Sequence, residues 1–134
     1  MSRHFSVLIV EDDDPLRQCL MDLLADEGWV VHATGSGREA VELARVHVLD
    51  FSLVDLHLPG ISGLDVIRTI AREIRPVPSI MMSGQATGEE ARIAAAEQGV
   101  FRFLRKPLDL QHLRWSMDLL IQHHFGPRFG PPLA

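Results

Sequence analysis

Short apolar segments alternate with amphipathic segments along the whole chain. The apolar segments are rich in β-branched and aromatic residues, and they predict five strands, at residues 5–10, 29–34, 51–54, 78–82 and 100–104. The segments that follow each strand repeat apolar residues at helical spacing and predict five helices. Strict alternation of strands and helices predicts an α/β fold with one parallel sheet. Because crossovers between parallel strands are right-handed, the helices are expected on both faces of this doubly wound sheet.

Capping and turn residues mark the ends of the expected helices. Asp14-Pro15 predicts the start of the first helix, and Gly28 predicts its end. Thr87 is a candidate cap for an Ala-rich fourth helix that runs through Gln98. Asp109 is the candidate cap of a fifth helix that ends near His123.

Length and composition are those of one ordinary domain. The chain has 134 residues, of which 46% are hydrophobic and 23% charged, so it is long enough for one core and too apolar for disorder. We expect a domain over 1–122, and the Gly/Pro-rich segment 123–134 is a tail or the start of an interdomain linker. We interpret the single cysteine, Cys19, and Trp115 as packing residues.

Charge and hydropathy limit the classes of partner. The net charge of −5 argues against binding nucleic acid by broad electrostatics, and nothing after residue 122 can form a helix-turn-helix. No apolar stretch is long enough for a membrane span, and the first residues lack a signal-peptide core. One cysteine excludes an internal disulfide framework, so the sequence predicts a cytoplasmic protein that contacts neither nucleic acid nor membrane.

Chemically active residues follow four of the predicted strands. The working groups of open parallel sheets gather beyond the carboxyl ends of the strands. Here these positions hold, in chain order, Glu11-Asp12-Asp13, Asp55, Ser83 and Lys106. Clustered carboxylates need a cation or protons, and an oxygen-only ligand set favours Mg²⁺. Such a site can align a phosphoryl group for attack by an aspartate, with the lysine and the hydroxyl on the remaining phosphoryl oxygens. Lys106 is the one lysine among 13 basic residues, which fits either a general bias toward arginine or a position that needs a compact ammonium.

Four segments together resemble the receiver domain of two-component response regulators. They are Val7–Asp13, Leu53–Gly63, Met82–Gly84 and Phe103–Pro107. Each is weak alone, but their order and spacing are specific, and the resemblance covers roughly residues 5 to 122. It implies a flavodoxin-like sheet with the strand order 2-1-3-4-5.

The resemblance also implies a role for each site residue. Asp55 is the phosphoacceptor, and Mg²⁺ is held by Glu11, Asp12, Asp55 and the backbone carbonyl of His57. Lys106 is the ion partner of the phosphoryl group, and its bond to Pro107 is expected to be cis.

Further residues are implied to report or limit phosphorylation. Ser83 is the switch hydroxyl, and Phe103 occupies the aromatic switch position, where tyrosine is commoner. His57 and Gln85 occupy positions that tune the lifetime of the acyl phosphate.

The implied function is signalling rather than catalysis on a separate substrate. The expected phosphoryl donor is a histidine kinase or a histidine phosphotransfer protein. The expected output is a downstream protein target or a fused output domain. A homodimer could form through the surface of the fourth helix, fifth strand and fifth helix.

Three rival functions share parts of these patterns. A flavodoxin-type nucleotide binder needs a phosphate cradle after the first strand, where this chain has Glu11 to Asp14. A haloacid-dehalogenase-type hydrolase also uses aspartate and Mg²⁺, but it needs cap segments that 134 residues hardly provide. The third alternative is a receiver-like docking module that works without phosphorylation.

Overall fold

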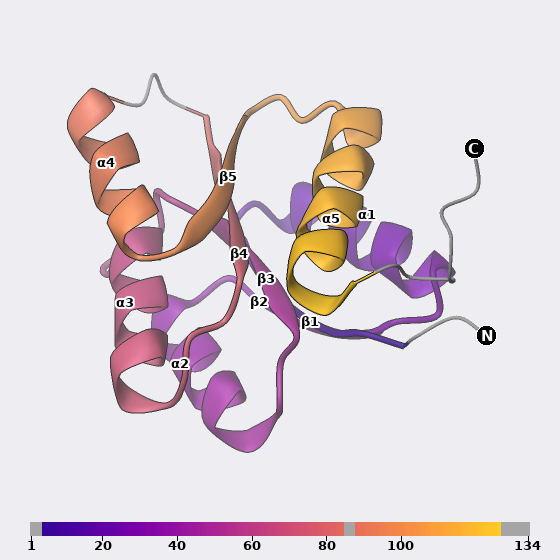
Figure 1. The fold of residues 1–134 in the computed structure, drawn as a ribbon, viewed down its shortest axis with the longest axis horizontal. Helices are drawn as coiled ribbons and strands as arrows, with labels where there is room; N and C mark the ends of the chain where they lie inside the picture. The colour runs from indigo at the N-terminus through magenta and orange to yellow at the C-terminus, as the bar shows by residue number, and fades with distance from the viewer. Residues whose placement is uncertain (1–3, 85–87, 127–134) are drawn as a thin grey trace.

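One parallel five-stranded sheet forms the centre of the protein (Figure 1). The computed structural model describes residues 4–84 and 88–126. The strands are β1 (Ser6–Val10), β2 (Val30–Thr34), β3 (Phe51–Asp55), β4 (Ser79–Ser83) and β5 (Val100–Arg105). Their order in the sheet is β2-β1-β3-β4-β5, and every neighbouring pair is parallel. Both the α/β class and the strand order predicted from the sequence are confirmed.

Five helices cover the two faces of the sheet. They are α1 (Asp14–Asp26), α2 (Gly37–Val46), α3 (Gly63–Glu73), α4 (Glu89–Glu97) and α5 (Leu110–Phe125). Helices α1 and α5 lie together on one side, while α2, α3 and α4 lie on the other (Figure 1). This is the doubly wound arrangement that right-handed crossovers produce.

Alternate residues of β1 enter two separate cores. Val7 and Ile9 pack with the apolar residues of α1 and α5, whereas Leu8 and Val10 pack with those of α2 and α3. All four side chains are fully buried, so this interior strand must be apolar on both faces. An aromatic cluster of Phe5, Trp29, Phe51 and Phe125 joins the end of α5 to the amino ends of the strands.

The helix boundaries agree with the sequence at some ends and differ at others. Asp109 caps α5 as predicted, because its side chain accepts hydrogen bonds from the backbone N–H groups of Gln111 and His112. The prediction of a Thr87 cap was wrong: the N-cap of α4 is Gly88, and Thr87 lies outside the described residues. A glycine in extended conformation at this position begins the helix without a side-chain cap.

Two residues interpreted as packing residues lie at the surface instead. Cys19 is exposed because the buried stripe of α1 runs through its neighbour Leu20 and through Leu24. Trp115 is 50% exposed, and the guanidinium of Arg102 lies 4.8 Å from the centre of its ring. The Arg102 guanidinium covers part of the indole, and this cation–π contact stabilises the partly exposed ring.

No helix within residues 4–84 and 88–126 combines the length and the apolar composition that crossing a bilayer requires.

Candidate functional site

Three carboxylates meet at the carboxyl edge of the sheet. Glu11 and Asp12 follow β1 directly, and Asp55 is the last residue of the adjacent strand β3. One oxygen from each carboxylate lies within 4.8 Å of the other two. Glu11 and Asp55 are buried, whereas Asp12 is exposed, so the cluster opens to solvent on the side of Asp12.

Lys106 lies between the two buried carboxylates. Its Nζ is 2.5 Å from Glu11 Oε1 and donates a hydrogen bond of 3.0 Å to Asp55 Oδ2. Burial on its own would lower the pKa of Lys106, but its hydrogen bonds to Glu11 and Asp55 outweigh that effect and raise it. The lysine is therefore fully charged and neutralises part of the acidic cluster.

The backbone holds the other carboxylate oxygens. The His57 N–H donates to Asp55 Oδ1 at 3.0 Å, and the Asp13 N–H donates to Glu11 Oε2 at 3.1 Å. Burial raises the pKa of Glu11 to about 7, although the hydrogen bonds from Lys106 and Asp13 lower it. A cation bound here would replace the solvation that Glu11 has lost.

The donor set fits a hard divalent cation. All three side chains present oxygen ligands, which Mg²⁺ prefers, and among the described residues no histidine or cysteine joins the cluster. Burial makes Glu11 costly to ionise even beside Lys106, as its raised pKa shows, so the site gains from a cation in addition to Lys106. Glu11, Asp12 and Asp55 are the residues that would hold it.

Ser83 and Phe103 lie next to this edge on neighbouring strands. Ser83 is buried at the end of β4, and its backbone oxygen accepts a 2.8 Å hydrogen bond from the Lys106 N–H. Phe103 on β5 is partly buried against the core on the α2 and α3 side. The peptide bond between Lys106 and Pro107 is cis. Gln85 lies outside the described residues.

Two residues to which the sequence analysis assigned no role support the site. Arg17 of α1 donates from Nη1 to the backbone oxygen of Glu11 at 2.8 Å. A Cβ atom on Gly63 would collide with the backbone oxygen of Asp55, so α3 can begin this close to β3 only with glycine at its first position. The Gly63 N–H also donates to Leu56 O at 2.8 Å. Gly63 belongs to the receiver-like segment Leu53–Gly63, but the sequence does not show which atoms Gly63 and Arg17 approach, since both contacts depend on how the loops meet.

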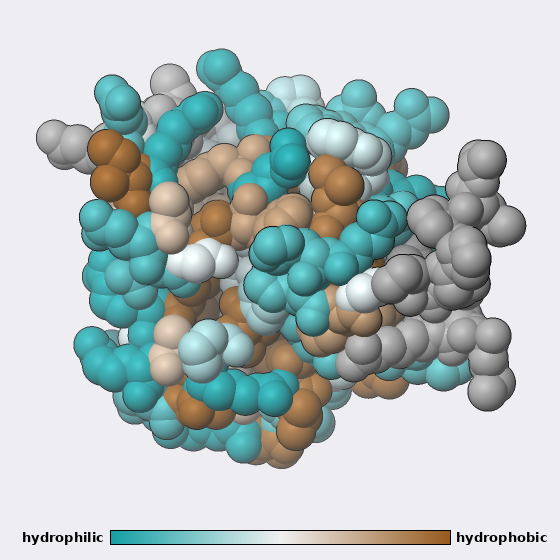
Figure 2. All heavy atoms as spheres, in the orientation of Figure 1, coloured by the Kyte–Doolittle hydropathy of each residue, from teal (hydrophilic) through white to brown (hydrophobic). Residues whose placement is uncertain are grey.

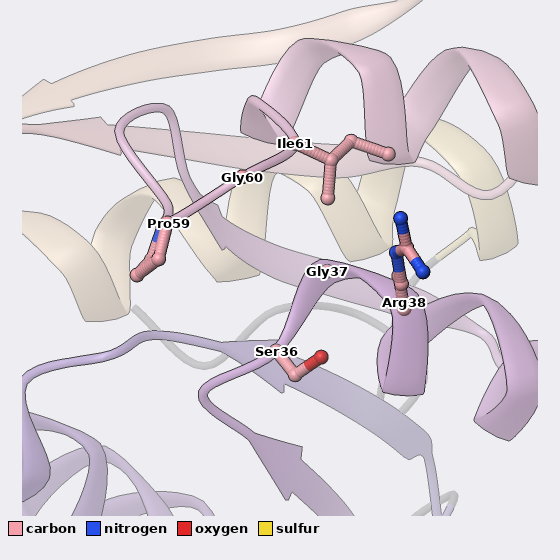
Figure 3. A pocket seen from close by; sticks show the side chains of 6 residues that line it. All are labelled: Ser36, Gly37, Arg38, Pro59, Gly60 and Ile61. Atoms are coloured by element: carbon pink, nitrogen blue, oxygen red, sulfur yellow. The ribbon is translucent and has the colours of Figure 1, made fainter.

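A pocket of about 290 Å³ opens at the start of α2 (Figure 3). It is lined by Ser36, Gly37 and Arg38 on one side and by Pro59, Gly60 and Ile61 of the β3–α3 loop on the other. None of the candidate site residues lines it. The pocket is thus a gap between two loops and is separate from the acidic cluster.

Comparison with known proteins identifies the family. The profile of the response regulator receiver domain matches residues 7–118 of this chain. The cell cycle response regulator CtrA of Brucella ovis is 32% identical over 120 residues, which are 90% of this chain and 51% of CtrA. The chain therefore belongs to the response regulator receiver domain family, and it spans about half the length of the curated relatives it matches.

Solved structures agree with the fold. The non-phosphorylated HemR receiver domain from Leptospira biflexa superposes with a TM-score of 0.79 at 28% identity, covering 87% of this chain and 93% of that domain. The chemotaxis protein CheY4 of Vibrio cholerae gives a TM-score of 0.81 at 23% identity, covering 88% and 99% of the two chains. At this identity the CheY4 match shows the shared fold alone.

Proposed function

We propose that this receiver domain accepts a phosphoryl group on Asp55 in a reaction that requires Mg²⁺. The observation that carries the proposal is the meeting of Glu11, Asp12 and Asp55 at one edge of the sheet, with the ammonium of Lys106 bound to Asp55. The family supports it, since receiver domains are the phosphoacceptors of two-component systems. The protein would act in signalling and not as an enzyme on a separate substrate.

The described contacts fit an in-line transfer from a phosphohistidine. An Asp55 oxygen attacks phosphorus, a P–O bond forms and the P–N bond to the donor imidazole breaks. Bound Mg²⁺ would supply positive charge to the phosphoryl oxygens, and Glu11, Asp12, Asp55 and the His57 carbonyl would hold it. The His57 N–H fixes the orientation of the Asp55 carboxylate before attack. The Lys106 ammonium then stays with the product, because its partner oxygen belongs to Asp55.

The proposed switch links this edge to the face formed by α4, β5 and α5. The Ser83 hydroxyl would bond the new phosphoryl group and Phe103 would fill the space that Ser83 leaves. His57 and Gln85 would set how fast the acyl phosphate hydrolyses. Because these movements bias two packings of the same residues, phosphorylation shifts a population rather than building a new structure.

The α4-β5-α5 face suits contact with another protein. Ile93, Leu110 and Trp115 expose apolar surface on α4 and α5. On the side drawn in Figure 2, apolar side chains form small areas bounded by hydrophilic ones. Such a mixed surface favours a reversible contact, either in a homodimer or with a downstream protein or fused output domain. The donor would be a histidine kinase or a histidine phosphotransfer protein, and the proposed setting is the cytoplasm.

Intact-mass measurement after incubation with acetyl phosphate tests the phosphoacceptor assignment. We expect one added phosphoryl group that requires both Mg²⁺ and Asp55 and is therefore absent from the Asp55→Asn variant. An adduct that persists in Asp55→Asn would show that another carboxylate is the acceptor. No adduct in the wild type, and no spectral change with beryllofluoride, would replace the proposal by a docking module that works without phosphorylation.

A further inference from the structure

Arg17 binds the backbone of the acidic segment rather than its side chains. Its Nη1 donates a 2.8 Å hydrogen bond to the carbonyl oxygen of Glu11, and its Nη2 is paired with Asp14 Oδ1 at 2.6 Å. The Arg17 side chain is 24% exposed, whereas that of Asp14 is 81% exposed. The guanidinium is therefore held from two sides, by the Glu11 carbonyl and by the Asp14 carboxylate.

The carbonyl that Arg17 binds lies between two of the candidate metal ligands. It belongs to the peptide group that joins Glu11 to Asp12, which are two of the three carboxylates in the cluster. Because a peptide group is planar, fixing its oxygen restricts the direction in which both flanking side chains leave the backbone. One hydrogen bond can thus orient two candidate ligands at once.

The neighbouring loop leaves room for this contact. A Cβ atom on Gly35 would lie 3.2 Å from Arg17 Nη1, 3.4 Å from the Asp12 Cα and 3.5 Å from the Glu11 oxygen. The β2–α2 loop therefore packs closely over the hydrogen bond. Any side chain at position 35 would crowd the guanidinium.

We propose that Arg17 is a positioning residue that orients Glu11 and Asp12 for binding a divalent cation, an inference that rests on the proposed function of this site. Groups that hold metal ligands in place without touching the metal commonly change metal affinity about 10- to 100-fold when they are removed. Arg17 acts in this way through the Glu11 carbonyl.

Electrostatics makes the test decisive. Arg17 carries a positive charge close to a cation site, so its charge alone would weaken cation binding, and removing it would tighten binding. If Arg17 positions the ligands, removing it weakens binding instead. The two explanations predict opposite signs for the same variant.

The experiment is calorimetric titration of the unphosphorylated full chain with Mg²⁺ alone. We expect Arg17→Ala to bind Mg²⁺ about tenfold more weakly than the wild type. Arg17→Lys keeps the charge, but one ammonium cannot hold both Glu11 and Asp14. The Mg²⁺ affinity of Arg17→Lys should therefore lie between those of the wild type and Arg17→Ala. Arg45→Ala is the matched control: it removes an arginine with its ion pairs to Glu42 and Glu73 from the last turn of α2, and it should leave the affinity unchanged.

A second variant covers the case in which Arg17→Ala loses stability. Gly35→Ala keeps Arg17, but the Cβ added at position 35 would lie 3.2 Å from Arg17 Nη1, so the guanidinium must move. We expect weaker Mg²⁺ binding here too, by a smaller factor, together with shifted backbone amide NMR signals of Asp12 and Asp13 in the metal-free chain.

Each outcome bears on one proposal. Unchanged or tighter Mg²⁺ binding in both Arg17→Ala and Gly35→Ala would overturn the positioning role. Failure of the wild type itself to bind Mg²⁺ would instead overturn the proposed function on which this role rests.

Discussion

Glu11 combines complete burial with a carboxyl group whose pKa is raised, by burial above all, from 4.5 to about 7. An acid with a raised pKa in the folded state contributes stability fully below the pKa of the unfolded state. This contribution is lost as the pH rises through the folded-state value. Without metal, the chain should therefore lose stability from Glu11 between pH 4.5 and about 7. We expect a decline on the order of 3 kcal/mol in the free energy of unfolding.

Urea denaturation of the metal-free chain across this pH range measures the effect. Glu11→Gln keeps the shape of the side chain but cannot ionise, so the decline should be flatter in that variant. Mg²⁺ should restore stability at the high end of the range, where it meets an ionised Glu11. Parallel pH profiles for wild type and Glu11→Gln would contradict the raised pKa.

The junction between β3 and α3 depends on one glycine. A Cβ atom on Gly63 would strike the backbone oxygen of Asp55, which cannot move without moving the candidate phosphoacceptor. On Gly37 a Cβ atom would strike the side chains of Ile61 and Val66, which can adjust. We expect Gly63→Ala to lower the free energy of unfolding by about 3 kcal/mol, and Gly37→Ala to lower it by less. Urea denaturation of the two variants measures the difference.

The rate of phosphorylation distinguishes Gly63 from a glycine that has no close neighbour. Gly63→Ala should slow the reaction with acetyl phosphate about tenfold or more, because it displaces the reacting carboxylate. Gly88→Ala, with open space around position 88, should leave the rate unchanged. Equal rates in Gly63→Ala and Gly88→Ala, compared by intact mass over time, would show that the contact with Asp55 does not matter for the chemistry.

At the scale of elements, the sequence predicts the strands and helices but not every helix end or buried face. Five strands and five helices follow from apolar periodicity, because parallel strands buried on both faces are short and continuously apolar. The start of α4 was misplaced because Thr87 and Gly88 are both acceptable caps, and local sequence does not decide between them. Cys19 was misplaced because a one-residue shift on α1 moves a side chain from the core to the surface.

At the candidate site, the sequence predicts which residues gather but not every contact that holds them. The carboxyl-edge rule and the receiver motifs predict that Glu11, Asp12, Asp55 and Lys106 lie together. The structure clusters the three carboxylates and pairs Lys106 with Glu11 and Asp55. The Arg17 and Gly63 contacts were not predictable, since each joins an ordinary residue to a backbone oxygen across a loop.

Helix α5 ends at the aromatic cluster. Helix α5 continues to Phe125, whose ring centre is 5.4 Å from that of Phe5. We propose that the domain extends through Phe125, three residues beyond the predicted boundary at residue 122. Phe125→Ala should lower the free energy of unfolding by about 2 kcal/mol. The exposed neighbour Gln122 offers a control, and Gln122→Ala should change it by about 0.5 kcal/mol or less. Similar urea midpoints for both variants would support the earlier boundary.

The whole molecule must carry a change at Asp55 to the α4-β5-α5 face, and its two tryptophans allow that to be observed. Trp115 is half-exposed on this face beside Arg102, the residue before Phe103 in β5, whereas Trp29 is buried among Phe5 and Phe51. If Phe103 moves when Asp55 carries a phosphoryl analogue, the guanidinium over Trp115 moves with β5. Beryllofluoride with Mg²⁺ should therefore change the tryptophan fluorescence of the wild type. The change should vanish in Trp115→Phe and in Asp55→Asn. A change that survives in Trp115→Phe would place the response in the core around Trp29 and contradict the proposed path through β5.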